Sequence, residues 1–565
     1  MGNTDTRIRT HIRLWDSLIH GPTHGALYHW DGDRYARTTW REVVADAHGM
    51  AATLRAAGVG PGTRVATVLT NSADCVRGLL AVWLAGGAVA SLPLPSRGQT
   101  LGEYGSLLES LTARLDPTLV LVDAQLEPLV PEGLRADLPV LSWSALHGPG
   151  RIEPSPPGLD DVAYIQYSSG STGGAKGCTL TPRAIAAQLG LILDMTGGRP
   201  GAEVIASWMP LSHDMGVFGL MLYSWAFDYD FVMSTPERFG MAPRSWFRDM
   251  SEFGATMTGG TTTALYLASR AQGRSALARE LALRVCVVGA ERVDAEVLAG
   301  VTGTFRDSGL SPSAFMPAYG MAEATLAVSA TGWADAPRVR GFDASALIEG
   351  KIVDLAEDDP GAVRLVSNGA PLPGVGVTME HPDEVSQLLV TSPSLATGYH
   401  ADPERTAERF RDGVLRTGDH GFVRDGEVYF VGRADDLVSV GGRNVYTSEI
   451  EAAVEALGPV RKGCSALVDV AGAGAGAGVA SAGGGLSELV LLLEPARKSD
   501  DFAQIADRAA ELAREKSGIS LSECVFVERG CLPRTPSGKI QRFRCRSMLT
   551  RDTSSLKIIS RVRLG

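Results

Sequence analysis

The sequence lacks an excess of positive charge. Its 53 Lys and Arg residues are outnumbered by 64 Asp and Glu residues, which gives a formal net charge of -11. Because nucleic-acid-binding proteins usually present a basic surface, this balance argues against a nucleic-acid partner. The longest apolar stretch, residues 78–90, is shorter than the roughly 18–20 residues that a membrane-spanning helix requires. The N-terminus is polar and has no signal-peptide core. These absences predict a cytoplasmic protein without a membrane span.

Cysteine is also sparse, and its pattern argues against two further classes of protein. The seven cysteines are scattered, none forms a CxxC pair, and their number is odd. We therefore expect reduced thiols and neither a disulfide framework nor a zinc site.

The chain has 565 residues, of which 44% are hydrophobic and 21% charged. This is a globular composition, and the length is enough for about two to four domains.

A glycine-rich run is the most informative stretch that the sequence does contain. Residues 167–177, YSSGSTGGAKG, combine hydroxyl groups, small side chains and one cation, Lys176. This composition suits a loop whose backbone N–H groups surround a polyphosphate. The run is not a Walker motif, because Lys176 is preceded by Ala175 and followed by Gly177. It predicts a phosphate-binding loop of another kind, and a flexible Gly/Ser turn is the alternative interpretation.

Short apolar strands alternate with helical stretches along much of the chain. Strands are predicted over Val65–Leu69 and Val162–Gln166, and others end at Val288 and near Met316. This alternation indicates layered α/β architecture, in which ligands bind beyond the carboxyl ends of the strands. The loops that follow the last three of these strands are therefore candidates for one shared site.

The pattern changes beyond residue 420. Asp425-Gly426 lies between apolar flanks and predicts a hairpin over residues 422–431. Charge and glycine then concentrate, which predicts a domain boundary near residue 433. Farther on, Ser448 and Glu451 have the spacing of a capping box at the start of a helix.

Four further runs place reactive side chains beside glycine or proline. WMPLSHDMG contributes His213, YGMAEATL contributes Glu323, RTGDH contributes Asp419, and PRTPSGKIQR contributes Lys539. Each alone has a structural interpretation, such as a buried ion pair or a turn cap. Together, in this order after the glycine-rich run, they resemble the adenylate-forming superfamily of acyl-CoA synthetases, peptide-synthetase adenylation domains and beetle luciferases. Within that superfamily the chain is most similar to fatty acyl-AMP ligases.

The resemblance implies an α/β fold in two parts. Residues 1–432 would form a large N-terminal domain of several subdomains that holds the ATP and acyl sites. Residues 433–565 would form a small, mobile α+β C-terminal domain, with Asp435 as its hinge and Lys539 as its catalytic lysine. Fatty acyl-AMP ligases also imply an insertion near residues 336–362.

The resemblance also assigns roles by position, with ATP and Mg²⁺ as the expected cofactors. The implied catalytic residues are Lys539, Glu323 and His213, and the implied metal ligands are Glu323 and Thr172. The implied nucleotide-binding residues are Ser171, Thr172, Gly173 and Lys176 for the β- and γ-phosphates, Gly289, Ala290, Glu291, Tyr319, Gly320 and Met321 around the adenine and α-phosphate, and Asp419 and Arg433 for the ribose.

The implied chemistry needs charge compensation more than a side-chain nucleophile. An anionic carboxylate must approach an anionic α-phosphate, and two unit charges about 4 Å apart repel by roughly 4 kcal/mol at an effective dielectric constant near 20. Mg²⁺ on Glu323 and the ammonium group of Lys539 would offset this repulsion. The absence of a GxSxG motif agrees with such a mechanism.

A thiol is the expected acceptor of the acyl group in a second half-reaction. The resemblance implies the phosphopantetheine of an acyl carrier protein. Residues 531–565 hold nine Lys and Arg against one acidic residue, and we expect this basic tail to help dock an acidic carrier. Free CoA is the alternative acceptor, because Gly441-Gly442 is more similar to acyl-CoA synthetases.

The carboxylic acid and the enzyme class also have alternatives. Thr261-Thr262-Thr263 stands where acyl-AMP ligases often carry Pro-Asn-Phe, which favours a shorter or more polar acid than a plain long-chain fatty acid. An amino-acid adenylation enzyme ranks lower, because residues 212–215 read SHDM where those enzymes place Phe-Asp. A non-catalytic nucleotide-binding module ranks lowest, since Glu323, Asp419 and Lys539 are all present.

Overall fold

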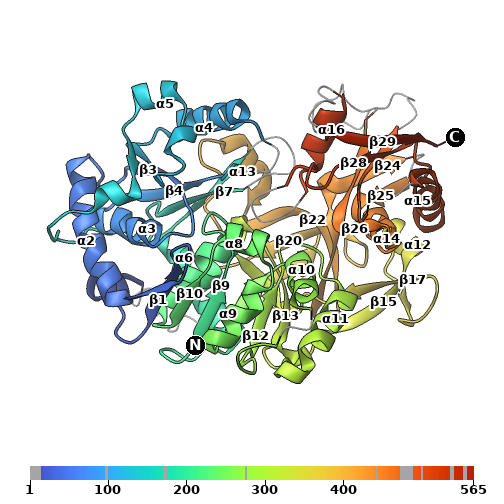
Figure 1. Ribbon diagram of the computed structural model, residues 1–565, viewed down its shortest axis with the longest axis horizontal. Coiled ribbons are helices and arrows are strands. Elements are labelled where there is room, and N and C mark those ends of the chain that lie inside the picture. The colour runs from blue at the N-terminus through green and yellow to red at the C-terminus, as the bar shows by residue number, and fades with distance from the viewer. Residues whose placement is uncertain are drawn as a thin grey trace.

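The computed structural model describes residues 14–95, 99–168, 175–273, 276–440, 443–470, 488–497, 501–534, 540–550 and 556–564. Figure 1 shows the N-terminal sheets and helices side by side with the strands and helices that follow residue 400. None of the described helices combines the length and the apolar character that a membrane crossing requires.

A nine-stranded sheet forms the centre of the molecule, in the order β18-β14-β13-β12-β11-β9-β10-β1-β2. Its parallel strands are β1 (Ala26–Trp30), β9 (Val204–Ser207), β10 (Asp230–Met233), β11 (Met257–Gly260), β12 (Val285–Val288) and β13 (Phe315–Gly320). Strands β2 (Tyr35–Thr39) and β14 (Ala327–Ala330) run antiparallel to them, and β18 (Ala370–Pro371) pairs antiparallel with β14 at the edge of the sheet. Because the parallel strands point the same way, their carboxyl ends meet at one edge, where ligands of α/β proteins bind.

A six-stranded sheet, in the order β6-β5-β3-β4-β7-β8, completes the N-terminal layers. It consists of β3 (Arg64–Val68), β4 (Ala88–Leu92), β5 (Leu119–Val122), β6 (Val140–Ser142), β7 (Tyr164–Ser168) and β8 (Lys176–Leu180). The strands predicted near residues 65 and 162 are confirmed as β3 and β7, each shifted by one or two residues. The apolar stretch at residues 78–90 divides between α3 (Ala73–Ala85) and β4, because Gly86 ends the helix in the left-handed conformation.

Helices cover both faces of the nine-stranded sheet (Figure 1). On one face lie α6 (Pro182–Thr196) and the π-helix η3 (Met215–Leu222), and on the other lie α9 (Ser245–Phe253) and α10 (Thr262–Gln272). Two adjacent glycines of β11 mark the two faces. A Cβ on Gly259 would face Met215 and Leu220 of η3, whereas a Cβ on Gly260 would lie 2.6 Å from the ring of Trp246 on α9. The face towards η3 therefore has room at Gly259 that a larger residue would fill.

The predicted hairpin around residue 425 is confirmed within a five-stranded sheet. Strands β22 (Val414–Arg424) and β23 (Glu427–Arg433) pair antiparallel, and Asp425 and Gly426 both have positive φ in the turn between them. The other strands of this sheet are β19 (Gly376–Met379), β20 (Ser386–Thr391) and β21 (Phe410–Arg411). The segment expected to be an insertion forms most of a separate three-stranded sheet of β15 (Val339–Asp343), β16 (Asp354–Leu355) and β17 (Ala362–Val366).

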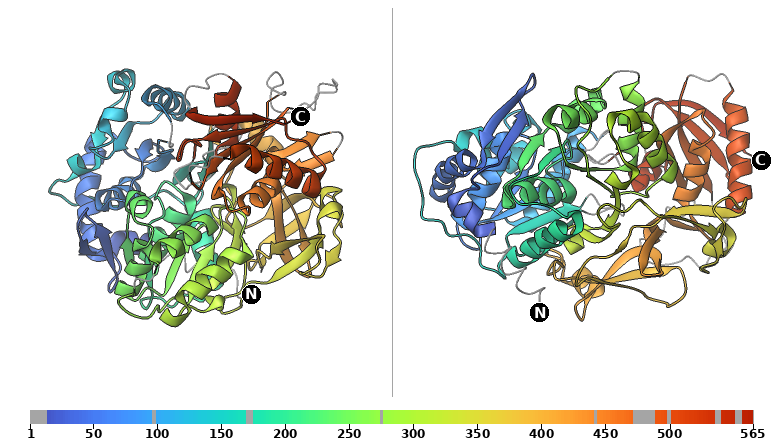
Figure 2. Two further views of the ribbon diagram at one scale, coloured as in Figure 1. Left: turned by 45° about the vertical axis from the view of Figure 1, so that its right-hand side comes forward. Right: turned by 90° about the horizontal axis from the view of Figure 1, so that it is seen from below.

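The last part of the chain begins with the hairpin β24 (Leu437–Val440) and β25 (Arg443–Tyr446). It continues with a four-stranded sheet of β26 (Val460–Asp469), β27 (Leu489–Pro495), β28 (Glu523–Val527) and β29 (Ile558–Arg563). Helices α14 (Thr447–Glu455) and α15 (Phe502–Ser517) share a buried apolar cluster with one face of this sheet, and α16 (Arg542–Thr550) shares one with the other. Figure 2 shows these elements grouped together, beside the N-terminal layers.

The predicted capping box at the start of α14 is wrong. Tyr446 is the N-cap residue and makes no side-chain capping bond. Glu451 instead accepts hydrogen bonds from the backbone of Leu467 and from the guanidinium group of Arg542. A tertiary partner far along the chain therefore replaces the local interaction that the spacing suggested.

Candidate functional site

A cavity of about 320 Å³ lies at the carboxyl edge of the nine-stranded sheet. Its walls come from the loops after β9, β12 and β13, from β22 and β23, and from Ile540 and Gln541 next to α16. It brings together eleven of the residues singled out in the sequence: Lys176, His213, Gly289, Ala290, Glu291, Tyr319, Gly320, Met321, Glu323, Asp419 and Arg433. Ser171, Thr172, Gly173 and Lys539 lie outside the described residues.

Glu323 and Lys176 meet through a tyrosine that the sequence did not reveal. Glu323 lies on the short 3-10 helix η6 (Ala322–Ala324), directly after β13, and its Oε1 accepts a hydrogen bond of 2.8 Å from the hydroxyl of Tyr399. The Nζ of Lys176, at the start of β8, lies 5.9 Å from the centre of the Tyr399 ring. Tyr399 therefore fixes the position of Glu323 beside a buried cation.

The charged groups around Lys176 favour an anion beside it. Burial lowers the pKa of Lys176 most, and Arg409, Arg405 and Arg433 lower it further, while Glu323 raises it. A phosphate group bound here would compensate the charges that destabilise the lysine cation. The surroundings of Lys176 thus match the phosphate-binding role that the glycine-rich run suggested.

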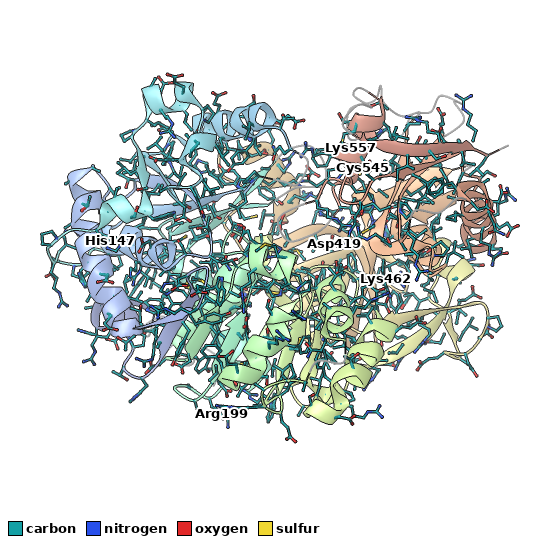
Figure 3. All side chains as sticks on the ribbon, viewed as in Figure 1. His147, Arg199, Asp419, Lys462, Cys545 and Lys557 are labelled. Atoms are coloured by element: carbon teal, nitrogen blue, oxygen red, sulfur yellow. The ribbon has the colours of Figure 1, made fainter. Side chains whose placement is uncertain are left out.

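Asp419 and Arg433 face each other across the hairpin. They are register partners of β22 and β23, and the Arg433 Nε lies 3.4 Å from Asp419 Oδ1. The hydroxyl of Tyr319 donates a hydrogen bond of 2.9 Å to Asp419 Oδ2, and the Tyr319 ring stacks on Phe430 at 6.0 Å between centres. Figure 3 labels Asp419 near the centre of the molecule. A carboxylate beside an aromatic surface can bind the hydroxyls of a sugar attached to a planar base.

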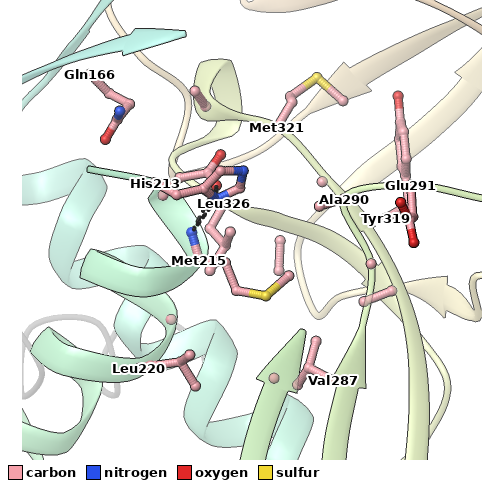
Figure 4. Close-up of a pocket in the computed structure, with 18 of the residues that line it drawn as sticks. Gln166, His213, Met215, Leu220, Val287, Ala290, Glu291, Tyr319, Met321 and Leu326 are labelled. Carbon is pink, nitrogen blue, oxygen red and sulfur yellow. Dashed lines mark hydrogen bonds and ion pairs between the residues drawn. The ribbon is translucent and has the colours of Figure 1, made fainter. Parts of the chain in front are cut away.

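His213 lies on the opposite side of the cavity, before η3. Its Nδ1 is 2.6 Å from Asp214 Oδ1 and 3.3 Å from the backbone N of Met215 (Figure 4). The Nδ1 atom cannot both donate a hydrogen bond to the Asp214 carboxylate and accept one from the Met215 N–H at the same time. We assign the proton to Nδ1, because its contact with Asp214 is shorter and the Met215 N–H also reaches Asp214 Oδ1 at 2.7 Å. Gln166 holds this loop by donating to the carbonyl oxygen of Ser212.

Glycine and alanine bring the backbone of two loops close to the cavity. A Cβ at Gly320 would lie 1.9 Å from the carbonyl oxygen of Leu326, so this position requires glycine. Ala290 has a positive φ of 66°, which aims the Gly289–Glu291 loop into the cavity. The Glu291 side chain accepts a hydrogen bond from the backbone N–H of Thr263 and thereby ties this loop to the start of α10.

The cavity continues as an apolar passage between the nine-stranded sheet and the helices on one face. The sheet contributes Ile205, Met257, Gly259, Val285 and Val287, and the helices contribute Ile192, Met195 and Leu220 (Figure 4). The side chain of Met215 lies at the junction of this passage with the polar part, since its Sδ would be 3.4 Å from a Cβ on Gly259 and its Cε 3.8 Å from a Cβ on Gly289. The site therefore has one charged end and one apolar end.

The three threonines expected near an acyl pocket do not line this passage. Thr261 caps α10 by accepting a bond from the backbone N of Ala264, and the hydroxyl of Thr262 donates to the carbonyl oxygen of Arg292. The hydroxyl groups of Thr261 and Thr262 are therefore bonded within the protein, and none of the three threonines lines the passage, so they give no reason to expect a polar acid.

Contacts between the early and late parts of the chain hold Ile540 and Gln541 against the cavity. Lys462 Nζ lies 2.6 Å from Asp294 Oδ2 and 5.5 Å from the centre of the Tyr266 ring. Arg544 pairs with Glu103 at 3.0 Å. The backbone of the expected hinge, Asp435, belongs to the 3-10 helix η7 (Ala434–Asp436) between β23 and β24.

Sequence reasoning missed Tyr399, Phe430, Gln166 and Met195, which all line the cavity or hold its residues. Three of them are apolar or aromatic residues in apolar surroundings, which is how ordinary core residues also look. Tyr399 follows Gly398 in a loop between β20 and α13 (Pro403–Arg409), and no spacing links it to Glu323, 76 residues earlier.

A magnesium ion is compatible with the residues at the charged end. Among the described residues, no group of three or more His, Cys, Asp and Glu side chains converges as a metal cluster. Mg²⁺ is usually held by one or two carboxylates together with substrate phosphates, rather than by an all-protein cage. Glu323, held by Tyr399 beside a phosphate-favouring region, supplies such a carboxylate.

Comparison with known families and proteins gives consistent results. The profile of the family described as AMP-binding enzyme matches residues 19–400. The medium-chain-fatty-acid–[acyl-carrier-protein] ligase JamA of Moorena producens is 32% identical, over 68% of this chain and 67% of its own. The long-chain-fatty-acid–AMP ligase FadD32 of Mycolicibacterium smegmatis is 27% identical, over 90% of this chain and 88% of its own.

Solved structures show the same similarity. A structure from a study of fatty acyl-adenylate ligases from E. coli and L. pneumophila superimposes with a TM-score of 0.85 at 25% identity, and the match covers 97% of this chain and 98% of the other. The similarity therefore extends over both the early and the late parts of the chain.

Proposed function

The chain belongs to the family of AMP-binding enzymes, and on that premise we propose that it is an acyl-AMP ligase for apolar carboxylic acids. It uses ATP to convert the acid into an acyl-adenylate, with release of pyrophosphate, and then transfers the acyl group to the thiol of an acyl carrier protein. One observation carries this proposal. A single cavity joins a charged end, suited to a nucleotide, to an apolar passage along the face of the sheet.

The charged end provides binding and orientation. Lys176 neutralises phosphate charge, and the glycine-rich loop with Ser171, Thr172 and Gly173 surrounds the β- and γ-phosphates. Asp419 and Arg433 bind the ribose, and the Gly289–Glu291 loop with Tyr319, Gly320 and Met321 encloses the adenine and the α-phosphate. The substrate carboxylate reaches the α-phosphate from the apolar side, past His213 and Met215, whose junction position supports this route.

Charge compensation is the remaining requirement of the adenylation step. Glu323 and Thr172 would hold Mg²⁺, which would supply positive charge at the phosphates. Lys539 adds the ammonium group that stabilises the charge developing on the α-phosphate. Its neighbours Ile540 and Gln541 line the cavity, which supports this assignment.

The late part of the chain is the proposed C-terminal domain, with its boundary near residue 433 and its hinge at Asp435. Its own buried clusters, which include Ile450 and Leu556, support a separate folding unit. Rotation about the hinge would withdraw Lys539 and admit the thiol acceptor.

A carrier protein is favoured as the acceptor over free CoA, since JamA is named as an acyl-carrier-protein ligase and FadD32 as an AMP ligase. The basic tail offers less free charge for docking than its composition suggests. Arg561 pairs with Glu523 at 3.0 Å, and Arg542 contacts Asp436 and Glu451. Docking of an acidic carrier on this face therefore competes with existing ion pairs.

The test is pyrophosphate exchange over a panel of carboxylic acids, followed by mass detection of the thioester on carrier protein and on CoA. We expect exchange with straight-chain acids and a thioester on the carrier. Exchange only with amino acids, or equal loading of CoA, would contradict the proposal. Lys539→Ala should abolish exchange while ATP still binds, and near-normal exchange would remove Lys539 from its role.

A further inference from the structure

The apolar passage runs the full length of the central strands. Gly259 and Gly289 line it near the carboxyl edge, whereas Met257 and Val285, the first residues of β11 and β12, line it at the opposite edge. Strand β11, Met257–Gly260, spans three steps of about 3.3 Å, so a passage that runs along the whole strand is about 10 Å long. With carbon–carbon bonds of about 1.5 Å at tetrahedral angles, an extended alkyl chain of about eight carbons spans this distance.

Three residues close the far end of the passage, and they differ in mobility. The hydroxyls of Thr196 and Tyr223 are 2.8 Å apart, and Thr196 also donates to the carbonyl oxygen of Ile192. These two side chains are fixed by their hydrogen bonds and by burial. Met195, at the end of α6, is an unbranched thioether with three rotatable bonds, and such a side chain adapts readily to its surroundings.

A second cavity of about 540 Å³ lies on the other side of Met195, over β14 and β18. Met195 is the residue that the described walls of the two cavities share. Ala327 at the start of β14 lines the first cavity and Ala330 at its end lines the second, so the second cavity continues along the same strand direction.

The second cavity is lined by apolar residues and by four charged ones, Asp194, Asp335, Arg338 and Glu427. Trp333, Pro371 and Leu372 line it, and the Trp333 indole is 54% exposed although it lies flat against the end of α6. A Cβ on Gly197 would come within 2.9 Å of that indole, so glycine permits this close contact. Arg338 pairs with Glu427 at 3.2 Å. An exposed aromatic floor that continues an acyl passage is suited to an alkyl tail.

We propose that Met195 is the movable end wall of the acyl passage and that the second cavity binds the tail of longer acyl chains. Acids of up to about eight carbons end against Met195. Longer acids displace its side chain and lay their tails on Trp333 and Leu372. This inference rests on the proposed function, because it concerns the acid bound at the same site.

The experiment measures kcat/KM for pyrophosphate exchange with hexanoate, octanoate, dodecanoate and hexadecanoate. Met195→Ala should raise the ratio of hexadecanoate to octanoate by about tenfold, and Met195→Trp should lower it by a similar factor, because one methylene in such a pocket changes discrimination by about tenfold or more. Leu193→Ala is the matched control, since Leu193 lies on the same helix outside both walls. It should leave the ratio at the value of the unaltered enzyme.

A second variant tests the tail site itself. Trp333→Glu places a charge on the exposed floor and should lower kcat/KM for hexadecanoate by about tenfold more than for octanoate, because a charge opposes burial of an alkyl tail. An unchanged ratio in both Met195→Ala and Trp333→Glu would overturn the inference. Absence of exchange with every straight-chain acid in the unaltered enzyme would instead contradict the proposed function, so the two failures are distinguishable.

Discussion

At the charged end of the cavity, side chains from distant parts of the chain form specific pairs, whereas at the apolar end neighbouring strands and the helices α6 and η3 supply a surface. Tyr399 contacts both Lys176 and Glu323, and Asp419 contacts Tyr319 and Arg433. The apolar end, from Gly259 to Met195, has shape but few polar groups. Substitutions at the charged end should therefore change the exchange rate with every carboxylic acid alike. Substitutions at the apolar end should change it for some acids more than for others.

The largest expected effect is at Glu323. Glu323→Gln removes the negative charge that holds the metal but retains an oxygen for the Tyr399 hydroxyl. We expect kcat for exchange to fall by about 10²–10³ with every acid, because preorganised electrostatic groups at reacting centres typically contribute this much. Tyr399→Phe is the control: it keeps the charge of Glu323 and removes one hydrogen bond to that carboxylate, which should cost about tenfold. A kcat for pyrophosphate exchange in Glu323→Gln above a tenth of that of the unaltered enzyme would contradict the assignment of Glu323 as a metal ligand.

Filling the passage tests the apolar end. Gly259→Leu would occupy the space beside Met215 and Leu220, and we expect kcat/KM for octanoate to fall by about a hundredfold while the Kd for ATP stays within about twofold. Gly259→Ala is the graded control, because its Cβ would meet no atom closer than 3.4 Å. If ATP affinity and kcat/KM for octanoate fell by the same factor, the two ends of the cavity would not act independently.

A substitution at Asp419 tests nucleotide binding in the absence of the carboxylic acid. Asp419→Asn removes a charge that contacts Tyr319 and Arg433. We expect the Kd for ATP, measured by calorimetry, to rise by about tenfold, as for the loss of one hydrogen bond to a charged group. The ranking of acids should remain that of the unaltered enzyme, and a changed ranking would place Asp419 in acid selection instead.

The pH dependence of ATP binding reports on Lys176. Burial lowers the pKa of Lys176 below its ordinary value, so the free enzyme loses this cation at a lower pH than an exposed lysine would. ATP affinity should therefore weaken as the pH rises through that depressed pKa, by at most about tenfold per pH unit. Lys176→Arg should abolish this alkaline dependence, because arginine stays protonated. The same pH profile in both proteins would exclude Lys176 as its cause.

The smallest expected effect concerns the ion pair between Lys462 and Asp294, which joins the late part of the chain to the early part. Lys462→Met keeps an apolar stem over Tyr266 but removes the ion pair with Asp294. Because partly exposed pairs contribute little, we expect exchange to slow by about two- to fivefold. Transfer of the acyl group from preformed acyl-adenylate to the carrier should not slow. Slower transfer with normal exchange would reverse this interpretation.

The charged end could be predicted from the sequence because its residues stand in recognisable runs. His213, Glu323 and Asp419 each lie within three residues of a glycine in the sequence, and the structure brings them to one cavity. The α/β layers and the hairpin at Asp425-Gly426 were predictable for similar reasons, since strand periodicity and turn chemistry are local.

What could not be predicted depends on contacts between distant residues. Glu451 had the spacing of a cap but pairs with Arg542, 91 residues later. The threonines at 261–263 suggested a polar pocket, yet none of them lines the passage, and the Thr261 hydroxyl caps a helix while that of Thr262 bonds to the Arg292 carbonyl oxygen. Met195 looks like any core methionine until the two cavities on either side of it are seen.

The buried cysteines have a consequence for an enzyme that makes a reactive acyl group. An acyl-adenylate acylates any accessible thiolate, whether it belongs to the carrier or to the protein itself. Cys178, two residues after Lys176 on β8, is fully buried, and burial raises its pKa well above the ordinary value, as do the nearby Glu323 and Asp214. Cys286 on β12 is likewise fully buried, and its pKa is raised to about 12. Protonated and enclosed, these two thiols do not compete with the carrier for the acyl group.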